Sequence, residues 1–211
     1  MLSAAVGPRV STHSETRRAI RRRRRCLTSS EQALAAERVA VALAQTRYFR
    51  ASRRIAFYFP NDGEMDLTPL LNLAWAMGKR CFMPVLDTLR WNRLWFAPYR
   101  EGDPLILNRF GIPEPAVAAR HRVHARSLDL IIAPLVAFDR NGNRLGMGGG
   151  YYDRTLGFLR HRMRWQKPRI VGAAYHFQEV PRLGQAPWDV PLDGIVTDRP
   201  PPLWCGSRVS V

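Results

Sequence analysis

Hydrophobic and polar positions form two kinds of pattern along the chain: short apolar runs, typical of buried strands, and longer amphipathic stretches, typical of helices. The apolar runs lie at 54–60, 81–86, 93–97, 128–138, 169–175 and 194–197. The helical patterns cover 14–26, 28–46, 68–77 and 151 to about 161. Strands that alternate with helices predict an α/β fold.

We therefore expect a single domain of three layers, with a mainly parallel sheet and helices on both faces, as in Rossmann-like folds. The length of 211 residues fits one domain. Residues 1–12 are predicted to be a disordered tail, 13–200 the domain and 201–211 a C-terminal tail. Within the domain, 99–127 is expected to be an irregular excursion over the surface.

One helix start is marked by local chemistry. Thr28 and Glu31 match a capping box, in which each side chain accepts a hydrogen bond from the other residue's backbone N–H. This pattern predicts that a helix begins directly after Thr28.

The chain is strongly basic, with a net charge of +16, and only Lys79 and Lys167 among its basic residues are lysines. Much of the charge is local, because the run Arg21–Arg25 lies near the N-terminus. A basic domain favours anionic partners, so a protein that binds nucleic acid through this run is one hypothesis.

The cysteines favour neither a zinc site nor a disulfide framework. Cys26, Cys81 and Cys205 are widely separated and odd in number. This pattern favours a reducing compartment, and we expect a cytoplasmic protein. No apolar run approaches the roughly 20 residues that span a bilayer, so no membrane association is expected.

A glycine-rich segment between a predicted buried strand and a predicted helix carries the clearest chemistry. Gly142, Gly146 and Gly148–Gly150 fall within nine residues, and Arg144 and Arg154 flank the last of them. Glycine permits positive φ and close approach of a ligand. Because open α/β sheets bind ligands at the carboxyl ends of their strands, we expect a phosphate site here. The spacing fits neither GxxxxGK[ST] nor GxGxxG.

Asp153 follows in the first turn of the predicted helix. A carboxylate there is stabilised by the helix dipole, but next to phosphates it is equally suited to bind Mg²⁺.

The segment Arg144–Arg154 closely resembles the signature of the 5-formyltetrahydrofolate cyclo-ligase family. Further similar segments, in the same order as in the family, extend the resemblance over residues 13 to 198: Gly63-Glu64, Gly111–Pro115, Asp129–Pro134, Ala137–Asp139, Val180-Pro181 and Trp188–Asp193.

The resemblance implies an enzyme that uses ATP and Mg²⁺ to convert 5-formyltetrahydrofolate to 5,10-methenyltetrahydrofolate, with release of ADP and phosphate. It implies that the formyl oxygen is phosphorylated and that N10 then attacks. The substrates are ATP and a folate that can carry a polyglutamate tail, and we expect a monomer. A relative that binds nucleotide or folate without turnover is a further hypothesis.

The family pattern assigns roles to individual residues. The catalytic residues are expected to be Arg144 and Tyr151, and the metal ligands Asp153 and Asp189. The residues expected to bind ATP are Arg17, Arg144, Leu145, Gly146, Met147, Gly148, Gly149, Gly150, Tyr151 and Tyr152. Those expected to bind folate are Phe59, Glu64, Met147, Gly148, Gly149, Gly150 and Tyr151. Phe59 is as well explained as the end of a core strand, and Phe110 either lines the folate pocket or packs on the surface.

The N-terminal helix departs from the family, which has a lysine followed four residues later by an arginine. Counting back from Leu27-Thr28 places His13 at the lysine position and Arg17 at the arginine position. Either a neighbouring arginine replaces the lysine, or the register differs by one turn and Arg21 takes the place of Arg17.

Overall fold

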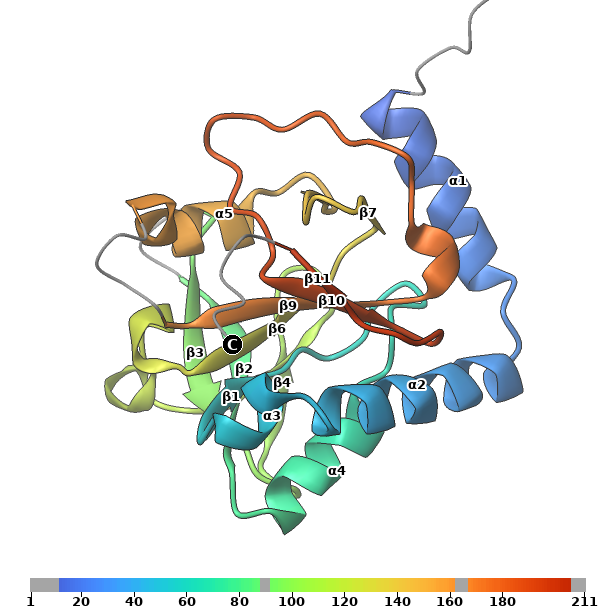
Figure 1. Cartoon of the computed structure of the whole chain (residues 1–211). Helices are drawn as coiled ribbons and strands as arrows, with labels where there is room; N and C mark the ends of the chain where they lie inside the picture. Colours follow the sequence, from blue (N-terminus) through green and yellow to red (C-terminus); the bar gives the residue numbers. More distant parts are fainter. Residues whose placement is uncertain (1–11, 88–91, 162–166, 206–211) are drawn as a thin grey trace, which may run out of the picture.

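A seven-stranded sheet lies at the centre of the computed structural model, which describes residues 12–87, 92–161 and 167–205 (Figure 1). Its strand order is β11-β10-β9-β6-β1-β2-β3. The strand bounds are β1 Arg54–Ala56, β2 Arg80–Leu86, β3 Leu94–Pro98, β6 Leu130–Ala133, β9 Arg169–Ala174, β10 Gly194–Thr197 and β11 Leu203–Trp204. The central strands β2, β1, β6, β9 and β10 run parallel, while β3 and β11 pair antiparallel at the edges. The predicted mainly parallel α/β sheet is confirmed.

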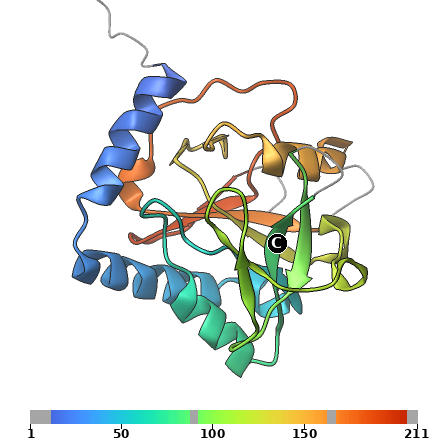
Figure 2. The same cartoon turned by 180° about the vertical axis from the view of Figure 1, so that it is seen from behind.

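Helices cover both faces of the sheet, as expected. α2 (Ser29–Ala44) and α4 (Thr68–Ala76) pack on one face, and α5 (Tyr151–Leu156) packs on the other (Figures 1 and 2). The remaining elements are α1 His13–Arg25, α3 Arg47–Ala51, the hairpins β4 Leu105–Leu107 with β5 Pro113–Pro115 and β7 Ala137–Phe138 with β8 Arg144–Leu145, and the 3₁₀ turns η1 Ala119–His121, η2 Ala125–Ser127, η3 Gly157–His161 and η4 His176–Gln178. None of the helices in the described ranges has the length and hydropathy that a bilayer span requires.

Capping boxes start both N-terminal helices. The predicted box of Thr28 and Glu31 is present at the start of α2. Thr12 and Glu15 form a second box at the start of α1, which fixes the residue at which the basic helix begins. Such caps contribute about 1 kcal/mol each. The predicted N-terminal tail otherwise lies outside the described residues.

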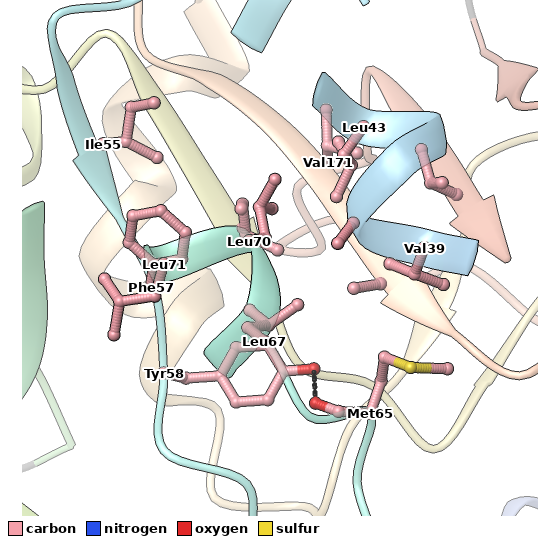
Figure 3. Packing of buried hydrophobic residues seen from close by; sticks show 14 of the residues in the cluster. Val39, Leu43, Ile55, Phe57, Tyr58, Met65, Leu67, Leu70, Leu71 and Val171 are labelled. Carbon is pink, nitrogen blue, oxygen red and sulfur yellow. Dashed lines mark hydrogen bonds between the residues drawn. The ribbon is translucent and has the colours of Figure 1, made fainter. Parts of the chain in front are cut away.

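The core beneath α2 and α4 holds the chain that leaves β1 (Figure 3). Val39 and Leu43 of α2 and Phe57 after β1 are fully buried, and such side chains contribute about 1.5–3 kcal/mol each. The Tyr58 hydroxyl donates a hydrogen bond to the carbonyl oxygen of Met65 at 3.0 Å. This contact closes the loop between these two residues and thereby fixes the position of the segment 59–64.

Three predicted elements are shorter than expected. The apolar run 54–60 forms a strand only over β1, Arg54–Ala56. The apolar run 128–138 is not one strand but β6 followed by β7, because Pro134 has no N–H to continue the sheet ladder. The predicted helix 151–161 is α-helical only to Leu156 and continues as η3.

Two segments expected to lack regular structure contain strands. The excursion 99–127 includes the β4–β5 hairpin. In the predicted C-terminal tail, Leu203 and Trp204 pair with β10. A Cβ on Gly194 would lie 2.3 Å from the Trp204 ring, so the glycine allows this edge strand to pack closely. In both cases the strand pairs antiparallel with a segment at most ten residues away in the chain.

Candidate active site

The expected site residues gather at the carboxyl ends of β1 and β6, which are neighbours in the sheet. The chain leaves β1 towards α4 and leaves β6 towards α5, on opposite faces. Such a change of direction creates a crevice between adjacent strands, and open α/β sheets bind ligands there. α1 lies at this end of the sheet, next to the β7–β8 hairpin (Figure 1).

The glycine loop between β8 and α5 has a backbone that only glycine adopts easily. Gly148 has φ +101° and Gly150 has φ +67°. A Cβ on Gly149 would lie 2.8 Å from the ring of Tyr151. The glycines therefore allow a tight turn that other residues would adopt only with strain.

Two arginines hold this loop from opposite sides. Arg17 of α1 donates from Nε to the carbonyl oxygen of Gly146 at 2.8 Å. Arg154 of α5 donates from Nη1 to the carbonyl oxygen of Gly149 at 2.7 Å. Both guanidinium groups thus lie at the loop, and the loop is fixed relative to α1.

The contacts of α1 distinguish the two candidate arginines. Arg17 reaches the glycine loop, whereas Arg21 donates to Asp62 at 2.6 Å. His13, at the first position of α1, is exposed and lies against Gly184. Of the two arginines left open by the sequence, Arg17 is the one that touches the loop.

Arg144 and Asp153 form a buried corner at the start of α5. The Arg144 side chain is 6% exposed, and its Nη2 lies 2.6 Å from Asp153 Oδ1. Its Nη1 donates to the carbonyl oxygen of Val190, whose N–H donates to the same Asp153 oxygen at 3.2 Å. Asp189 is the residue before Val190, and its Oδ2 accepts the N–H of Ala186 at 2.8 Å. The fold therefore brings Asp153 next to Val190, the neighbour of Asp189, while the Asp189 carboxylate accepts a hydrogen bond within its own segment.

Three arginines of α1 converge on Asp62. Nε of Arg21 and of Arg25 each lie 2.6 Å from one of its carboxylate oxygens, and Arg24 Nη2 lies 3.1 Å from Oδ2. Burial raises the pKa of Asp62, but the hydrogen bonds from these guanidinium groups outweigh it and lower the pKa to about 2.

Glu64 lies in a more enclosed place two residues further on. Its Oε1 is 4.0 Å from Nη1 of the fully buried Arg24, and its Oε2 accepts the N–H of Asn61 at 3.2 Å. Burial raises the pKa of Glu64 to about 7, although the charge of Arg24 opposes the rise. The pKa of Tyr152 is raised by burial and then by the negative charge of Glu64, so this α5 side chain lies within electrostatic reach of Glu64.

Aromatic side chains lie next to α5 and after β1. Phe110 packs edge-on against Tyr151 with ring centroids 6.0 Å apart, and Arg109 Nη2 donates to the Tyr151 hydroxyl at 2.5 Å. Met147 is half exposed. Phe59 is half-buried and packs edge-on against Tyr99 at 5.3 Å. Phe110 therefore reaches the glycine-loop helix, while Phe59 also belongs to the border of the core.

Sequence reasoning missed Arg24, which lies inside a run of arginines that resembles a solvated helix face. Its helical spacing contains the signal: Arg17, Arg21 and Arg24 follow at i, i+4 and i+7 and so share one face of α1. Arg109 was also missed, and no feature of its surroundings in the sequence marks it.

The comparisons with known proteins agree with this geometry. The model of the 5-formyltetrahydrofolate cyclo-ligase family matches residues 9–198. A 5-formyltetrahydrofolate cyclo-ligase of Escherichia coli K12 is 38% identical over 187 residues, which are 88% of this chain and 98% of the relative. One from Haemophilus influenzae is 38% identical over 86% of this chain and 95% of its own. The solved 5,10-methenyltetrahydrofolate synthetase of Aquifex aeolicus superposes with a TM-score of 0.77 at 33% identity, covering 94% of this chain and 95% of that one. The chain therefore belongs to the 5-formyltetrahydrofolate cyclo-ligase family.

Proposed function

We propose that this protein converts 5-formyltetrahydrofolate to 5,10-methenyltetrahydrofolate at the expense of ATP, which becomes ADP and phosphate. The observation that carries the proposal is the placement of two groups at one end of the sheet. A glycine loop held by Arg17 and Arg154 leads directly into α5, where the charge of the enclosed Glu64 acts on Tyr152. One half suits a polyphosphate and the other suits a ring with N–H donors, as the family's reaction requires.

The phosphate half uses backbone and guanidinium groups. The loop 145–150 offers backbone N–H groups, and Tyr151 and Tyr152 continue it into α5. Arg17 supplies positive charge from α1, and Arg144 supplies it from β8. Such groups neutralise phosphate charge, which is the main requirement of phosphoryl transfer.

Asp153 and Asp189 are the carboxylates that we propose to hold Mg²⁺, and Val190, next to Asp189, contacts Asp153. Asp153 already binds a cationic group in this structure, the guanidinium of Arg144. In the described part of the chain no group of three or more potential ligands gathers. A site of two carboxylates is what Mg²⁺ uses when substrate phosphates and water complete its shell. When bound, Mg²⁺ would neutralise phosphate charge; Arg144 would keep Asp153 and the Val190 carbonyl in position.

The folate half depends on Glu64. As a carboxylate it can accept hydrogen bonds from N–H groups of the pterin ring. Phe59 and Tyr151 offer aromatic surface for the ring, and Met147 together with Gly148–Gly150 lies where both substrates would meet.

The reaction can proceed without a protein nucleophile. The formyl oxygen attacks the γ-phosphorus, and the bond to ADP breaks. N10 then attacks the activated carbon and loses its proton, and phosphate leaves with the electron pair of the C–O bond. Arg144 would stabilise the transferred phosphoryl group, and Tyr151 would hold the formyl group next to it. Positioning and charge neutralisation account for catalysis of this kind.

A direct assay tests the proposal. The protein is mixed with 5-formyltetrahydrofolate and Mg²⁺-ATP, and the methenyl product is followed by its absorbance. We expect Arg144→Ala and Asp153→Asn to lower kcat/KM by about 100-fold or more. Arg140→Ala is the matched control, because Arg140 lies on the same hairpin but pairs with Glu179 at the surface. Lack of ATP-dependent product with the wild-type protein refutes the function, and wild-type kinetics in both variants refute the site.

The nucleic-acid hypothesis loses much of its basis. Arg21, Arg24 and Arg25 are engaged by Asp62, and Arg23 lies 4.3 Å from the centre of the Phe177 ring. These arginines stabilise the fold around the crevice. The turnover assay separates the enzyme from a relative that only binds its ligands. A monomer, a cytoplasmic location and the use of polyglutamylated folate stay predictions.

A further inference from the structure

Arg24 is the one charged side chain of α1 that is completely buried among the described residues. Its Nη2 lies 3.1 Å from Asp62 Oδ2, and its Nη1 lies 4.0 Å from Glu64 Oε1 and donates to the carbonyl oxygen of Leu135 at 3.4 Å. Its Nε has no hydrogen-bond partner within the described ranges. A buried guanidinium is costly unless carboxylates compensate it. Arg24 is thus shared between two carboxylates, and it lies closer to Asp62, at 3.1 Å, than to Glu64, at 4.0 Å.

The loop geometry places the carboxylates of Asp62 and Glu64 next to α1. Asp62 has φ +52° and Gly63 has φ +71°, so two successive residues adopt the left-handed conformation. A Cβ on Gly63 would lie 3.3 Å from Cβ and from the carbonyl oxygen of Arg24. The glycine therefore lets the loop press directly onto α1, and Asp62 and Glu64 flank this contact.

Several other charged and titratable groups act on Glu64. From α1, Arg21 adds positive charge; from the loop, Asp62 adds negative charge. The negative charge of Glu64 also raises the pKa of the hydroxyls of Tyr58, after β1, and Tyr152, in α5. Of the positive groups that act on Glu64, Arg24 is the strongest.

We propose that Arg24 is a positioning residue that keeps Glu64 ionised and directed into the crevice, and that Asp62 limits this effect by competing for the same guanidinium. The inference rests on the proposed function, since the ionised carboxylate matters because it binds the folate. Asp62 and Arg24 together would then set the pH range in which the folate binds, without touching it. ATP binding would depend on neither.

The first experiment measures the ionisation of Glu64 itself. The full chain is labelled with ¹³C at the glutamate carboxyl carbons, and Glu64→Gln identifies the Glu64 signal in a pH titration. We expect the midpoint to move up in Arg24→Gln and down in Asp62→Asn, because these variants remove opposite charges. Arg25→Gln is the matched control: Arg25 pairs with the same Asp62 at 2.6 Å, but within the described ranges it forms no ion pair with Glu64. Its midpoint should stay at the wild-type value.

The second experiment measures equilibrium binding of 5-formyltetrahydrofolate against pH, without ATP. Raising the midpoint by about one pH unit lowers the ionised fraction near neutral pH roughly fivefold, so the Kd should weaken about fivefold in Arg24→Gln and recover at alkaline pH. Arg24→Lys should lie closer to the wild type. The KM for ATP should not change in these variants.

The outcomes separate the two proposals. If the wild-type protein binds no 5-formyltetrahydrofolate at any pH, the proposed function fails. If it binds with a pH-dependent Kd but Arg24→Gln leaves both midpoints unchanged, the role of Arg24 is wrong. Should Arg24→Gln not fold, Asp62→Asn decides alone, since an upward or absent shift of the Glu64 midpoint contradicts the competition for Arg24.

Discussion

Replacing Glu64 by Gln should stabilise the folded protein at neutral and alkaline pH. Burial raises the pKa of Glu64 from 4.5 to about 7 in the folded chain. A carboxyl group with a raised pKa contributes stability below its unfolded value, and this contribution is lost as the pH rises through the folded value. The stability contribution of Glu64 is therefore lost between about pH 4.5 and 7, and the loss is complete above pH 7.

The magnitude follows from the size of that rise. Each pKa unit corresponds to about 1.4 kcal/mol, so ionising Glu64 costs the wild-type fold about 3 kcal/mol above pH 7. Gln has nearly the same shape and carries no charge, and the variant avoids this cost. The gain in the free energy of unfolding should be small near pH 4.5 and grow to about 3 kcal/mol by pH 8, which corresponds to roughly 10 °C in Tm.

Urea denaturation at several pH values between 5 and 8, followed by tryptophan fluorescence, measures this difference. Glu31→Gln is the control with the opposite sign, because hydrogen bonds from the backbone and side chain of Thr28 lower the pKa of Glu31. That variant should be less stable than the wild type at neutral pH. A stability difference for Glu64→Gln that does not vary with pH would refute the assigned burial of an ionisable Glu64. Folate binding should be lost in the same variant, so stability and function would oppose each other at this residue.

Further predictions concern the phosphate loop and its support. Arg17→Ala should raise the KM for ATP about tenfold, since Arg17 Nε contacts the loop, whereas Arg18→Ala, on an exposed position of the same helix, should not; steady-state kinetics decide. Gly150→Ala should lower the free energy of unfolding by about 1 kcal/mol, because Gly150 has φ +67° and its new Cβ would displace the Arg154 guanidinium. ATP binding measured by calorimetry should also weaken; unchanged affinity would contradict the role of the loop conformation. Asp139→Ala should lower the free energy of unfolding by about 3 kcal/mol, because the buried carboxylate accepts hydrogen bonds from three backbone N–H groups and one side-chain amide; an unchanged Tm would show that these donors find other partners.

Local features of the sequence determined much of this protein. The alternation of apolar runs and helical stretches was enough for the α/β class, and the Thr28 capping box was enough for the start of α2. The cluster of glycines before Tyr151 indicated a tight loop between a strand and a helix, and its order with other segments indicated the family. These properties depend on residues close together in the chain, so a reader of the sequence can recover them.

Only the tertiary structure decided how charges and edges are paired. Pro134 ended β6 within an apolar run that reads as one strand, and Trp204 joined the sheet from a segment that reads as a tail. Arg24 became a buried partner of Asp62 and Glu64, although its neighbours in the sequence suggest a solvated helix face. Asp153 and Val190 came together across 37 positions. Burial and ion pairing depend on which distant segments the fold brings together, and no local sequence pattern specifies these contacts.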